Sequence, residues 1–444
     1  MSSAAIARFL LRFAWVVPLA FLAAMRWGFT LDFPMLDQWE LPLLLQRWHD
    51  GTLDAAALFA QHNEHRPAVP RLLMLALARV TQWDVRAETN LTLLLGLALF
   101  GVLAAQARAR LAYASAPRRH AVALVISTLV FSLAAWRNWF LGWQLQLVLS
   151  VLLAVLTLHA LTHAELTRRR FTYALLLAVL NTYAFANALL VWPLGLVVLL
   201  GRCWPAWRER RKYAALWTAT GVVLCTAYFW DFSIPASQED APGGIRLLAF
   251  AGYAFAYLGA PLAFWIPLAI ALGAAGVARL AMVARGYARP TATTTLEGRA
   301  YPRATLTQWA NGPDAFWYAL ALYALGTAAL SAVARHDYGI AQALSSRYTT
   351  IGMLLWVSVA VLNAAHAKRR TWPVLVVIAL FAAAASLHGA YRWTEHWAAY
   401  STARPSLEAV EHGPGLQYLY PDEEELLRRA AWLRVHRLSI WGDI

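Results

Sequence analysis

The chain of 444 residues has few charged residues and almost no lysine. Asp, Glu, Lys and Arg together make up 14% of the sequence, and Lys212 and Lys368 are the only lysines among 38 basic residues. Soluble domains typically contain about 25% charged residues. Together with a hydrophobic content of 60% and a mean hydropathy of +0.48, this shortage excludes a soluble protein and predicts an integral membrane protein.

Cysteine is also scarce. Cys203 and Cys225 are the only two cysteines, and their spacing is not that of a metal site, so the sequence predicts neither a disulfide framework nor a zinc site. The net charge is +14, but the basic residues occur in short clusters between apolar stretches. A nucleic-acid-binding protein gathers its basic residues on one surface, and we therefore expect no nucleic-acid partner.

Long apolar stretches recur between Ile6 and Tyr391. A membrane-spanning helix needs about 20 mostly apolar residues, and the pattern predicts an all-α polytopic membrane protein with about 11 spans. No signal-peptide cleavage pattern precedes the first stretch, so we expect it to be retained. The predicted spans are 6–26, 88–107, 120–136, 145–164, a pair of short helices within 171–201, 213–230, 262–284, 315–334, 349–365 and 372–391.

Arginine clusters in short loops predict the orientation, because such clusters mark the cytoplasmic side. They place the N-terminus on the cytoplasmic side and the C-terminus on the outer side of the membrane. Only four of the 24 acidic residues fall on the cytoplasmic side, which agrees with this orientation. The clusters are Arg8/Arg12, Arg108–Arg119, Arg168–Arg170, Arg202–Lys212, Arg279–Arg303 and Lys368–Arg370.

The predicted domain organisation is a transmembrane module over 1–391 and a small periplasmic helical tail over 392–444. The first periplasmic loop, 28–86, contains Leu41–Trp48 and Pro67–Val80, which are too short to span and suit helices on the membrane surface. A second periplasmic segment runs from Asp231 to about Ala260. The cytoplasmic loop Arg285–Gly312 is rich in Thr, Pro, Gly and Arg, and we expect it to be mobile.

Three acids directly follow the first span. Asp32, Asp37 and Glu40 lie within nine positions, and carboxylates beside an apolar wall can have raised pKa values or hold a cation. The structural alternative is that these acids face water and that Asp37 caps a helix over 39–48.

A second polar cluster opens the predicted helix 67–80. It consists of His62, Asn63, Glu64, His65 and Arg66, followed by Arg71. Guanidinium groups at a helix N-terminus suit a phosphate. The two histidines also permit a metal site, although they lack the spacing of zinc-protease histidines. The structural alternative is capping together with an ion pair from Glu64 to an arginine.

A third cluster combines Trp136–Gln146 with Ser345–Thr349. Tryptophan near a membrane interface usually belongs to the aromatic belt, but a belt does not explain Asn138 and Gln144. Indole and amide groups such as those of Trp139 and Gln144 can stack on and hydrogen-bond a sugar. Arg347, beside Tyr348, can hold an anionic lipid head group.

This layout resembles the GT-C superfamily of integral membrane glycosyltransferases, which take sugars from polyprenyl-phosphate carriers. The resemblance comes from the inside N-terminus, the long first outer loop with surface helices and the acid just after the first span. The segments His62–Arg66, Trp136–Gln146, Phe185–Asn187 before Trp192–Pro193, and Ser345–Thr349 also resemble motifs of a group of bacterial polytopic membrane proteins without an assigned activity.

The resemblance implies an inverting transfer of a sugar to a glycan, lipid or protein acceptor on the periplasmic side. Asp37, or alternatively Asp32, corresponds to the catalytic acid of the loop and would act as the base. Arg66, Arg71 or Arg347 would hold the carrier's phosphate. A divalent cation such as Mg²⁺ or Mn²⁺ is compatible with the pattern but not required by it. The alternatives are a transporter or flippase of a lipid-linked glycan and a noncatalytic subunit of an envelope-polysaccharide complex.

Overall fold

A computed structural model describes residues 9–203, 207–234, 246–287, 309–366 and 371–442. Within these ranges the regular structure is helical, apart from one isolated bridge between His62 and His65. Seven of the described helices are long and apolar enough to cross a membrane, and three shorter ones are also apolar. The chain is therefore an α-helical, multi-pass membrane protein, as predicted, whereas the count of about 11 spans stays a prediction.

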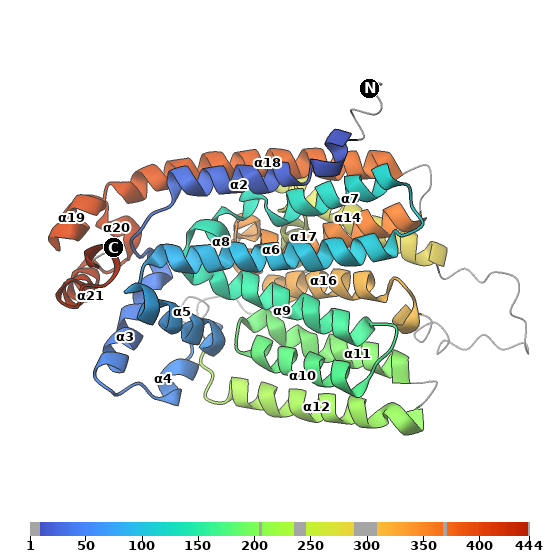
Figure 1. Cartoon of the computed structure of the whole chain (residues 1–444), viewed down its shortest axis with the longest axis horizontal. Helices are drawn as coiled ribbons and strands as arrows, with labels where there is room; N and C mark the ends of the chain where they lie inside the picture. Colours follow the sequence, from blue (N-terminus) through green and yellow to red (C-terminus); the bar gives the residue numbers. More distant parts are fainter. Residues whose placement is uncertain (1–8, 204–206, 235–245, 288–308, 367–370, 443–444) are drawn as a thin grey trace, which may run out of the picture.

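The long helices run alongside one another in a bundle (Figure 1). Two of them, α9 and α17, are buried along almost their whole length and form its core. Each long helix overlaps one of the predicted spans. They are α2 (Val16–Phe29), α6 (Val85–Arg110), α7 (Ala116–Val130), α9 (Leu145–Thr162), α10 (Arg168–Thr182), α11 (Val191–Cys203), α12 (Trp207–Phe229), α14 (Ile266–Tyr287), α16 (Ala315–Arg335), α17 (Thr349–His366) and α18 (Thr371–Ser401).

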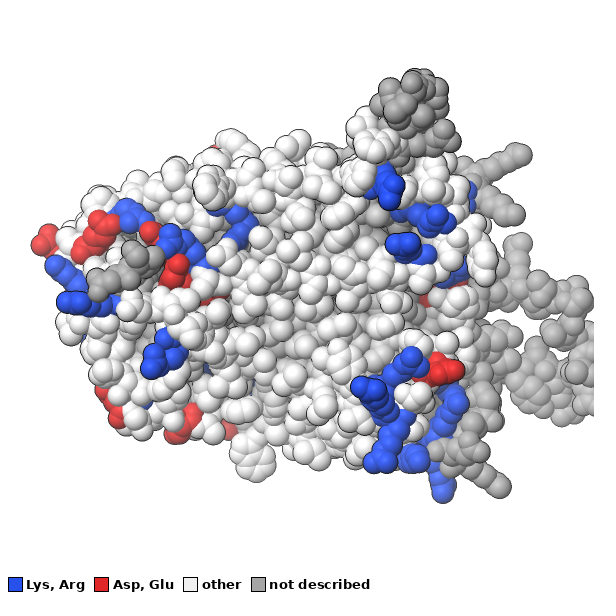
Figure 2. All heavy atoms as spheres, viewed as in Figure 1, with Lys and Arg blue, Asp and Glu red and all other residues white. Residues whose placement is uncertain are grey.

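The two ends of the bundle differ in charge. Figure 2 shows a wide, nearly uncharged band, with mainly basic side chains at one end and mixed acidic and basic side chains at the other. We call the end with mainly basic side chains the basic end. We call the opposite end the tail end, because the last helices of the chain lie there (Figure 1). An uncharged band between two charged ends is what a lipid bilayer requires of a protein that crosses it.

Short helices cover the tail end. The predicted surface helices at 41–48 and 67–80 form as α3 (Leu41–His49) and α5 (Ala68–Thr81), and α4 (Ala55–Phe59) lies between them. The Asp54 carboxylate caps α4 by accepting the Ala57 N–H at 2.8 Å. Asp37 does not cap α3, because it lies in the preceding 3-10 helix η1 (Leu36–Glu40). The capping role suggested for Asp37 is therefore wrong.

The tail is built onto the first loop. It contains α19 (Arg404–Ala409), α20 (Leu416–Leu419) and α21 (Glu423–Val435), after α18 has continued past Tyr391 to Ser401. Arg404 pairs with Asp32, and Arg429 pairs with Glu40 at 3.2 Å. Two of the three acids that directly follow the first span are thereby engaged by the tail.

Further short helices complete the tail end. The predicted periplasmic segment 231–260 contains the apolar helix α13 (Leu247–Gly259), which packs closely against α14: no space remains at Gly259 and Gly273 for a Cβ atom. The 3-10 helices η7 (His336–Tyr338) and η8 (Ile340–Leu344) join α16 to α17. Most of the predicted mobile loop Arg285–Gly312, together with the basic residues Arg8 and Lys368–Arg370, lies outside the described residues.

At the basic end, charged side chains pair across helices. Asp314, which is 1% exposed, accepts hydrogen bonds from Arg110 Nε at 2.5 Å and pairs with His366 Nε2 at 2.6 Å. Arg202, 2% exposed, donates to the backbone carbonyls of Ala164 and Ala310 at 3.0 and 3.3 Å. These contacts connect α6, α11, α16 and α17, and they satisfy charges that would otherwise be costly to bury.

Candidate functional site

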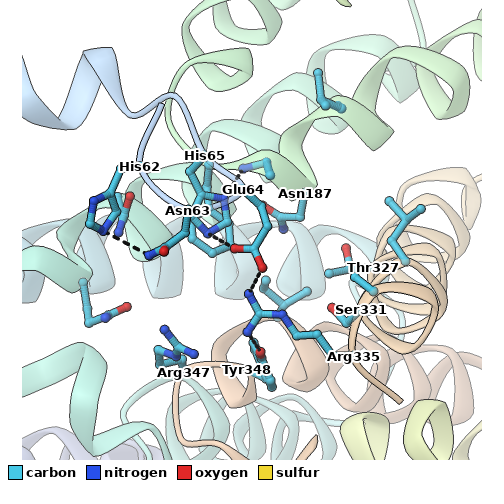
Figure 3. A pocket seen from close by; sticks show the side chains of 18 of the residues that line it. His62, Asn63, Glu64, His65, Asn187, Thr327, Ser331, Arg335, Arg347 and Tyr348 are labelled. Atoms are coloured by element: carbon cyan, nitrogen blue, oxygen red, sulfur yellow. Dashed lines mark hydrogen bonds and ion pairs between the residues drawn. The ribbon is translucent and has the colours of Figure 1, made fainter. Parts of the chain in front are cut away.

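The tail end contains a cavity of about 590 Å³ (Figure 3). Its walls come from η1, the turn before α5, the start of α9, the segment before α11, and the tail-end parts of α12, α13, α16 and α17. Segments more than 300 residues apart therefore meet there. The polar and aromatic side chains that line it include Asp37, His62, Asn63, Glu64, His65, Trp143, Gln144, Gln146, Phe185, Asn187, Tyr228, Tyr257, Thr327, Ser331, Arg335, Gln342, Arg347 and Tyr348.

A tight turn carries four of these side chains. His62 and His65 exchange two backbone hydrogen bonds, at 2.8 and 2.9 Å, and Asn63 between them has a φ of +50°. Asparagine is among the few side chains that tolerate this left-handed conformation. The turn presents His62, Asn63, Glu64 and His65 to the cavity together (Figure 3).

Glu64 joins the turn to the opposite wall. Arg335, from the end of α16, donates to Glu64 Oε1 and to the Tyr348 hydroxyl, both at 2.6 Å (Figure 3). Burial alone would raise the pKa of Glu64, but the Arg335 guanidinium holds that pKa below its usual value. Glu64 is thus ionised at neutral pH, and this charge-assisted contact fixes the guanidinium in the cavity wall.

His65 is a neutral member of the site. Its ring stacks on Phe185 with centroids 4.0 Å apart, and Nδ1 accepts the Ala186 N–H at 3.3 Å. Because Nδ1 accepts a hydrogen bond, the ring proton belongs on Nε2. Burial, reinforced by the charge of Arg335, lowers the pKa of His65 to about 3.

Asp37 lies beside His62, with Oδ2 3.9 Å from His62 Nε2. Burial would raise the pKa of the Asp37 carboxyl, but His62 and Arg347 together keep that pKa below its ordinary value. The Asp37 side chain is 41% accessible, and an ionised carboxylate that lines a cavity can accept a proton from a hydroxyl group or attract a cation. It is the only acidic side chain besides Glu64 among the described residues that line the cavity.

A buried hydrogen-bonded group fixes the position of Asp37. The neighbouring Gln38, 1% exposed, donates to Glu88 at 2.6 Å, and the indole of Trp83 donates to the same carboxyl group at 2.9 Å. Gly142 packs directly against Glu88 and Gln38, where a Cβ atom would overlap both. The segments that carry Trp83, Glu88 and Gly142 therefore hold η1 in place, and Asp37 with it.

Aromatic and amide groups form the remaining walls. Trp143 lies edge-on to His62, with ring centroids 5.1 Å apart. Gln146, which is 3% exposed, also lines the cavity, and its buried Oε1 atom has no hydrogen-bond partner among the described residues. An unsatisfied buried amide oxygen is costly, and it is available to accept a hydrogen bond from a ligand hydroxyl. Flat apolar rings next to such amides suit a sugar ring.

The rim of the cavity includes exposed apolar side chains. Phe229 at the end of α12, Leu330 on α16 and Tyr338 in η7 are 54%, 48% and 46% exposed. Large apolar groups exposed beside a cavity indicate contact with lipid or with an apolar ligand. The polar interior and apolar rim together fit an amphiphilic ligand.

The structure brings seven of the predicted site residues to this cavity and places six others elsewhere. Those that line it are Asp37, His62, Glu64, His65, Gln144, Arg347 and Tyr348. Asp32 and Glu40 are instead engaged by the tail. Because neither acid lines the cavity, the alternative assignment of Asp32 as the base has no geometric support.

The predicted phosphate-binding arginines of the turn and α5 have structural roles. Arg66 donates to the backbone carbonyls of Tyr228 and Trp230, both at 2.7 Å, and so joins the turn to the end of α12. Arg71, 6% exposed, donates to the carbonyls of Leu58 and, at 2.5 Å, Ala60. Both guanidiniums are occupied by main-chain oxygens and do not line the cavity.

The last two predicted residues support the walls from behind. Asn138 is fully buried and donates to the Arg347 carbonyl at 3.1 Å and to Thr350 Oγ1 at 2.8 Å. Trp139, 1% exposed, donates to the Ser132 carbonyl and packs on Gly96, so its ring is not available to stack on a sugar. Asn138 holds the backbone of Arg347 in position.

Sequence reasoning missed Arg335. It ends an alanine-rich apolar helix, where a basic residue usually marks only the helix end. Its ion pair with Glu64 joins residues 271 positions apart, and no local pattern indicates such a contact. Tyr257, Thr327 and Ser331 were missed for the same reason, because they lie within apolar helices.

Among the residues that the structure describes, no group of three or more His, Cys, Asp or Glu side chains is arranged to hold a metal ion. No family model matches the sequence, and neither curated proteins nor solved structures match the chain. The geometry of the cavity is therefore the only guide to function.

Proposed function

We propose that this chain is a GT-C-like glycosyltransferase of a bacterial inner membrane. It would move a sugar from a polyprenyl-phosphate carrier to a glycan, lipid or protein acceptor on the periplasmic side. The single observation that carries this proposal is that the Asp37 carboxylate and the Arg347 guanidinium line one cavity together with sugar-sized aromatic and amide walls. The apolar rim supports a substrate with a lipid portion.

In the proposed reaction Asp37 acts as the base. An acceptor hydroxyl loses its proton to the Asp37 carboxylate while its oxygen forms a bond to the anomeric carbon of the donor sugar. The bond between that carbon and the phosphate oxygen breaks, and its electron pair stays on the phosphate. Attack opposite the leaving group inverts the anomeric configuration. The pKa of Asp37, which His62 and Arg347 hold below its ordinary value, keeps the carboxylate ionised at neutral pH.

Arg347 would stabilise the charge that develops on the departing phosphate, because a guanidinium donates two parallel hydrogen bonds to an oxyanion. Glu64 neutralises the neighbouring Arg335, so Arg347 is the cation left to act on the substrate. Gln144 and Gln146 would bind sugar hydroxyl groups. The proposed orientation places the tail end and the C-terminus in the periplasm, and the basic end and N-terminus in the cytoplasm.

The test is sugar transfer by the purified full-length protein with Asp37→Asn. We expect the rate to fall by about 10²–10⁴-fold, the contribution of a general base, because asparagine cannot take up the proton. Asp50→Asn is the matched control, since Asp50 is an exposed acid at the end of α3, and it should transfer at the wild-type rate. Full activity of the Asp37→Asn protein would remove Asp37 from the base role.

A transporter or flippase of a lipid-linked glycan is the alternative from a different class. It would move the intact carrier without breaking the anomeric bond. Reconstituted protein that carries the lipid across vesicle membranes, but releases no carrier phosphate in the presence of acceptors, would favour transport over transfer.

A further inference from the structure

A second, smaller cavity of about 360 Å³ lies at the tail end. It is enclosed by α8 (Trp136–Phe140), the turn between α13 and α14, the junction of η8 with α17, and α18. We call it the basic pocket, because five of its lining residues carry or can carry positive charge and no Asp or Glu lines it among the described residues. The five are Arg137, Arg347, His388, Arg392 and His396.

Several polar atoms of the basic pocket lack partners. Arg137 Nε, Arg347 Nε and the hydroxyl oxygens of Ser345 and Ser346 are shielded from solvent and have no hydrogen-bond partner among the described residues. Ser346 as a whole is only 8% exposed. Buried donors without partners are rare, because each one lowers the stability of the fold. Four of them in the lining of one small cavity indicate a site completed by a ligand.

The donor types identify the chemistry of that ligand. Two guanidiniums and two hydroxyls can each donate hydrogen bonds and suit a tetrahedral oxyanion such as phosphate. Arg392 is partly neutralised by an ion pair with Glu395 at 2.9 Å. His396 stacks on Trp136 with centroids 4.7 Å apart. Arg137 and Arg347 therefore supply the principal charge of the pocket.

The surroundings of the pocket indicate how the anion arrives. Phe264 in the turn between α13 and α14 is 54% exposed and stacks on His388 of α18, with centroids 4.1 Å apart. Trp265 and Leu387 beside them are 63% and 61% exposed. These exposed apolar side chains suit contact with lipid chains. A phosphate carried on a lipid can reach the pocket along this surface.

We propose that the basic pocket binds the phosphate group of an anionic ligand, for which the apolar side chains around Phe264 favour a membrane lipid as the source. The site is distinct from the larger cavity, although Arg347 and Gln342 line both. The proposal does not depend on the sugar transfer proposed above, because binding is measured without a sugar or an acceptor.

The test is calorimetric titration of the full-length protein, in a neutral maltoside detergent, with three probes at matched ionic strength. They are dihexanoyl phosphatidylglycerol, inorganic phosphate, and the zwitterionic dihexanoyl phosphatidylcholine. Binding of phosphatidylglycerol alone supports the site with a lipid as the source. Equal binding of inorganic phosphate supports the site with free phosphate as the ligand. Equal binding of all three, or of none, would overturn the proposal.

Variants localise the binding. Arg137→Gln should weaken phosphatidylglycerol binding by about tenfold or more, because it removes a charged donor. Arg79→Gln is the matched control: Arg79 is an exposed arginine near the end of α5, away from the pocket, and its loss should leave affinity unchanged. An Arg137→Gln protein that binds as tightly as the wild type would contradict the proposal.

A serine variant separates binding from folding. The double variant Ser345→Ala/Ser346→Ala removes hydroxyls that lack partners in the unliganded fold, so the melting temperature without ligand should stay equal or rise. Its affinity for phosphatidylglycerol should fall several-fold. A lower melting temperature together with unchanged affinity would show that these hydroxyls serve the fold and would contradict their role in the site.

Discussion

The basic end and the tail end of the bundle use their polar side chains in opposite ways. At the basic end Asp314 has two partners, Arg110 and His366, and the terminal nitrogens of Arg202 donate to backbone carbonyls. At the tail end, Gln146 and Arg347 each have a buried side-chain atom without a hydrogen-bond partner among the described residues. Gln146 lines the cavity that contains Asp37, and Arg347 lines both that cavity and the basic pocket. Groups whose hydrogen-bonding capacity is filled hold helices together, whereas unfilled groups are available to a ligand. The ligand sites proposed above both lie at the tail end.

The largest effect on stability should come from the basic end. Asp314→Ala leaves Arg110 without its buried partner, and breaking such a pair costs about 3–5 kcal/mol. We expect the free energy of unfolding, measured by denaturant titration in mixed micelles, to fall by about that amount. Asp50→Ala removes an exposed acid and should change it by less than about 0.5 kcal/mol. If Asp314→Ala leaves the free energy of unfolding unchanged, the paired groups at the basic end do not hold the helices together.

The next effect concerns a histidine of the cavity. His65 has a pKa of about 3 in the fold and about 6.5 when unfolded, so the unfolded chain binds the proton more readily. Stability from this residue is therefore complete above pH 6.5 and is lost as the pH falls towards 3. Between pH 7.5 and 5.0 the wild type should lose about 2 kcal/mol more than His65→Gln. Parallel pH profiles of the two proteins would contradict the burial of a neutral imidazole.

The smallest effect should come from the acid that the tail engages. Asp32 and Arg404 are partly exposed, with side chains 31% and 40% accessible, and such pairs contribute about 0–1 kcal/mol. Asp32→Asn should lower the free energy of unfolding by about 0.5 kcal/mol and change the transfer rate by less than about threefold. Transfer assays of Asp32→Asn beside Asp37→Asn test this directly. A loss as large as that of Asp37→Asn would transfer the base role to Asp32.

Much of the helical fold could be predicted from the sequence. The predicted spans 349–365 and 145–164 begin and end within a few residues of α17 and α9, because hydropathy determines whether a helix suits a bilayer. The helix α13 was missed, since its apolar run of 13 residues is too short to be recognised as a span. The docking of the tail could not be predicted, because it depends on ion pairs between residues nearly 400 positions apart.

The site could be predicted only where its polar residues are adjacent in the chain. The turn at His62–His65 is such a case, and so is the acid loop that contains Asp37. No local pattern distinguishes Asp32, Asp37 and Glu40, since their difference depends on which acids pair with Arg404 and Arg429. Arg335 was overlooked because its partner Glu64 is distant in the sequence.

The turn at His62–His65 has a mechanical consequence. Two backbone hydrogen bonds close it, so its backbone moves as one unit. On the α12 side, Arg66 anchors the turn to the carbonyls of Tyr228 and Trp230, and Gln61 donates to the Ser233 carbonyl. A ligand that displaces the backbone of this turn must therefore also shift the end of α12.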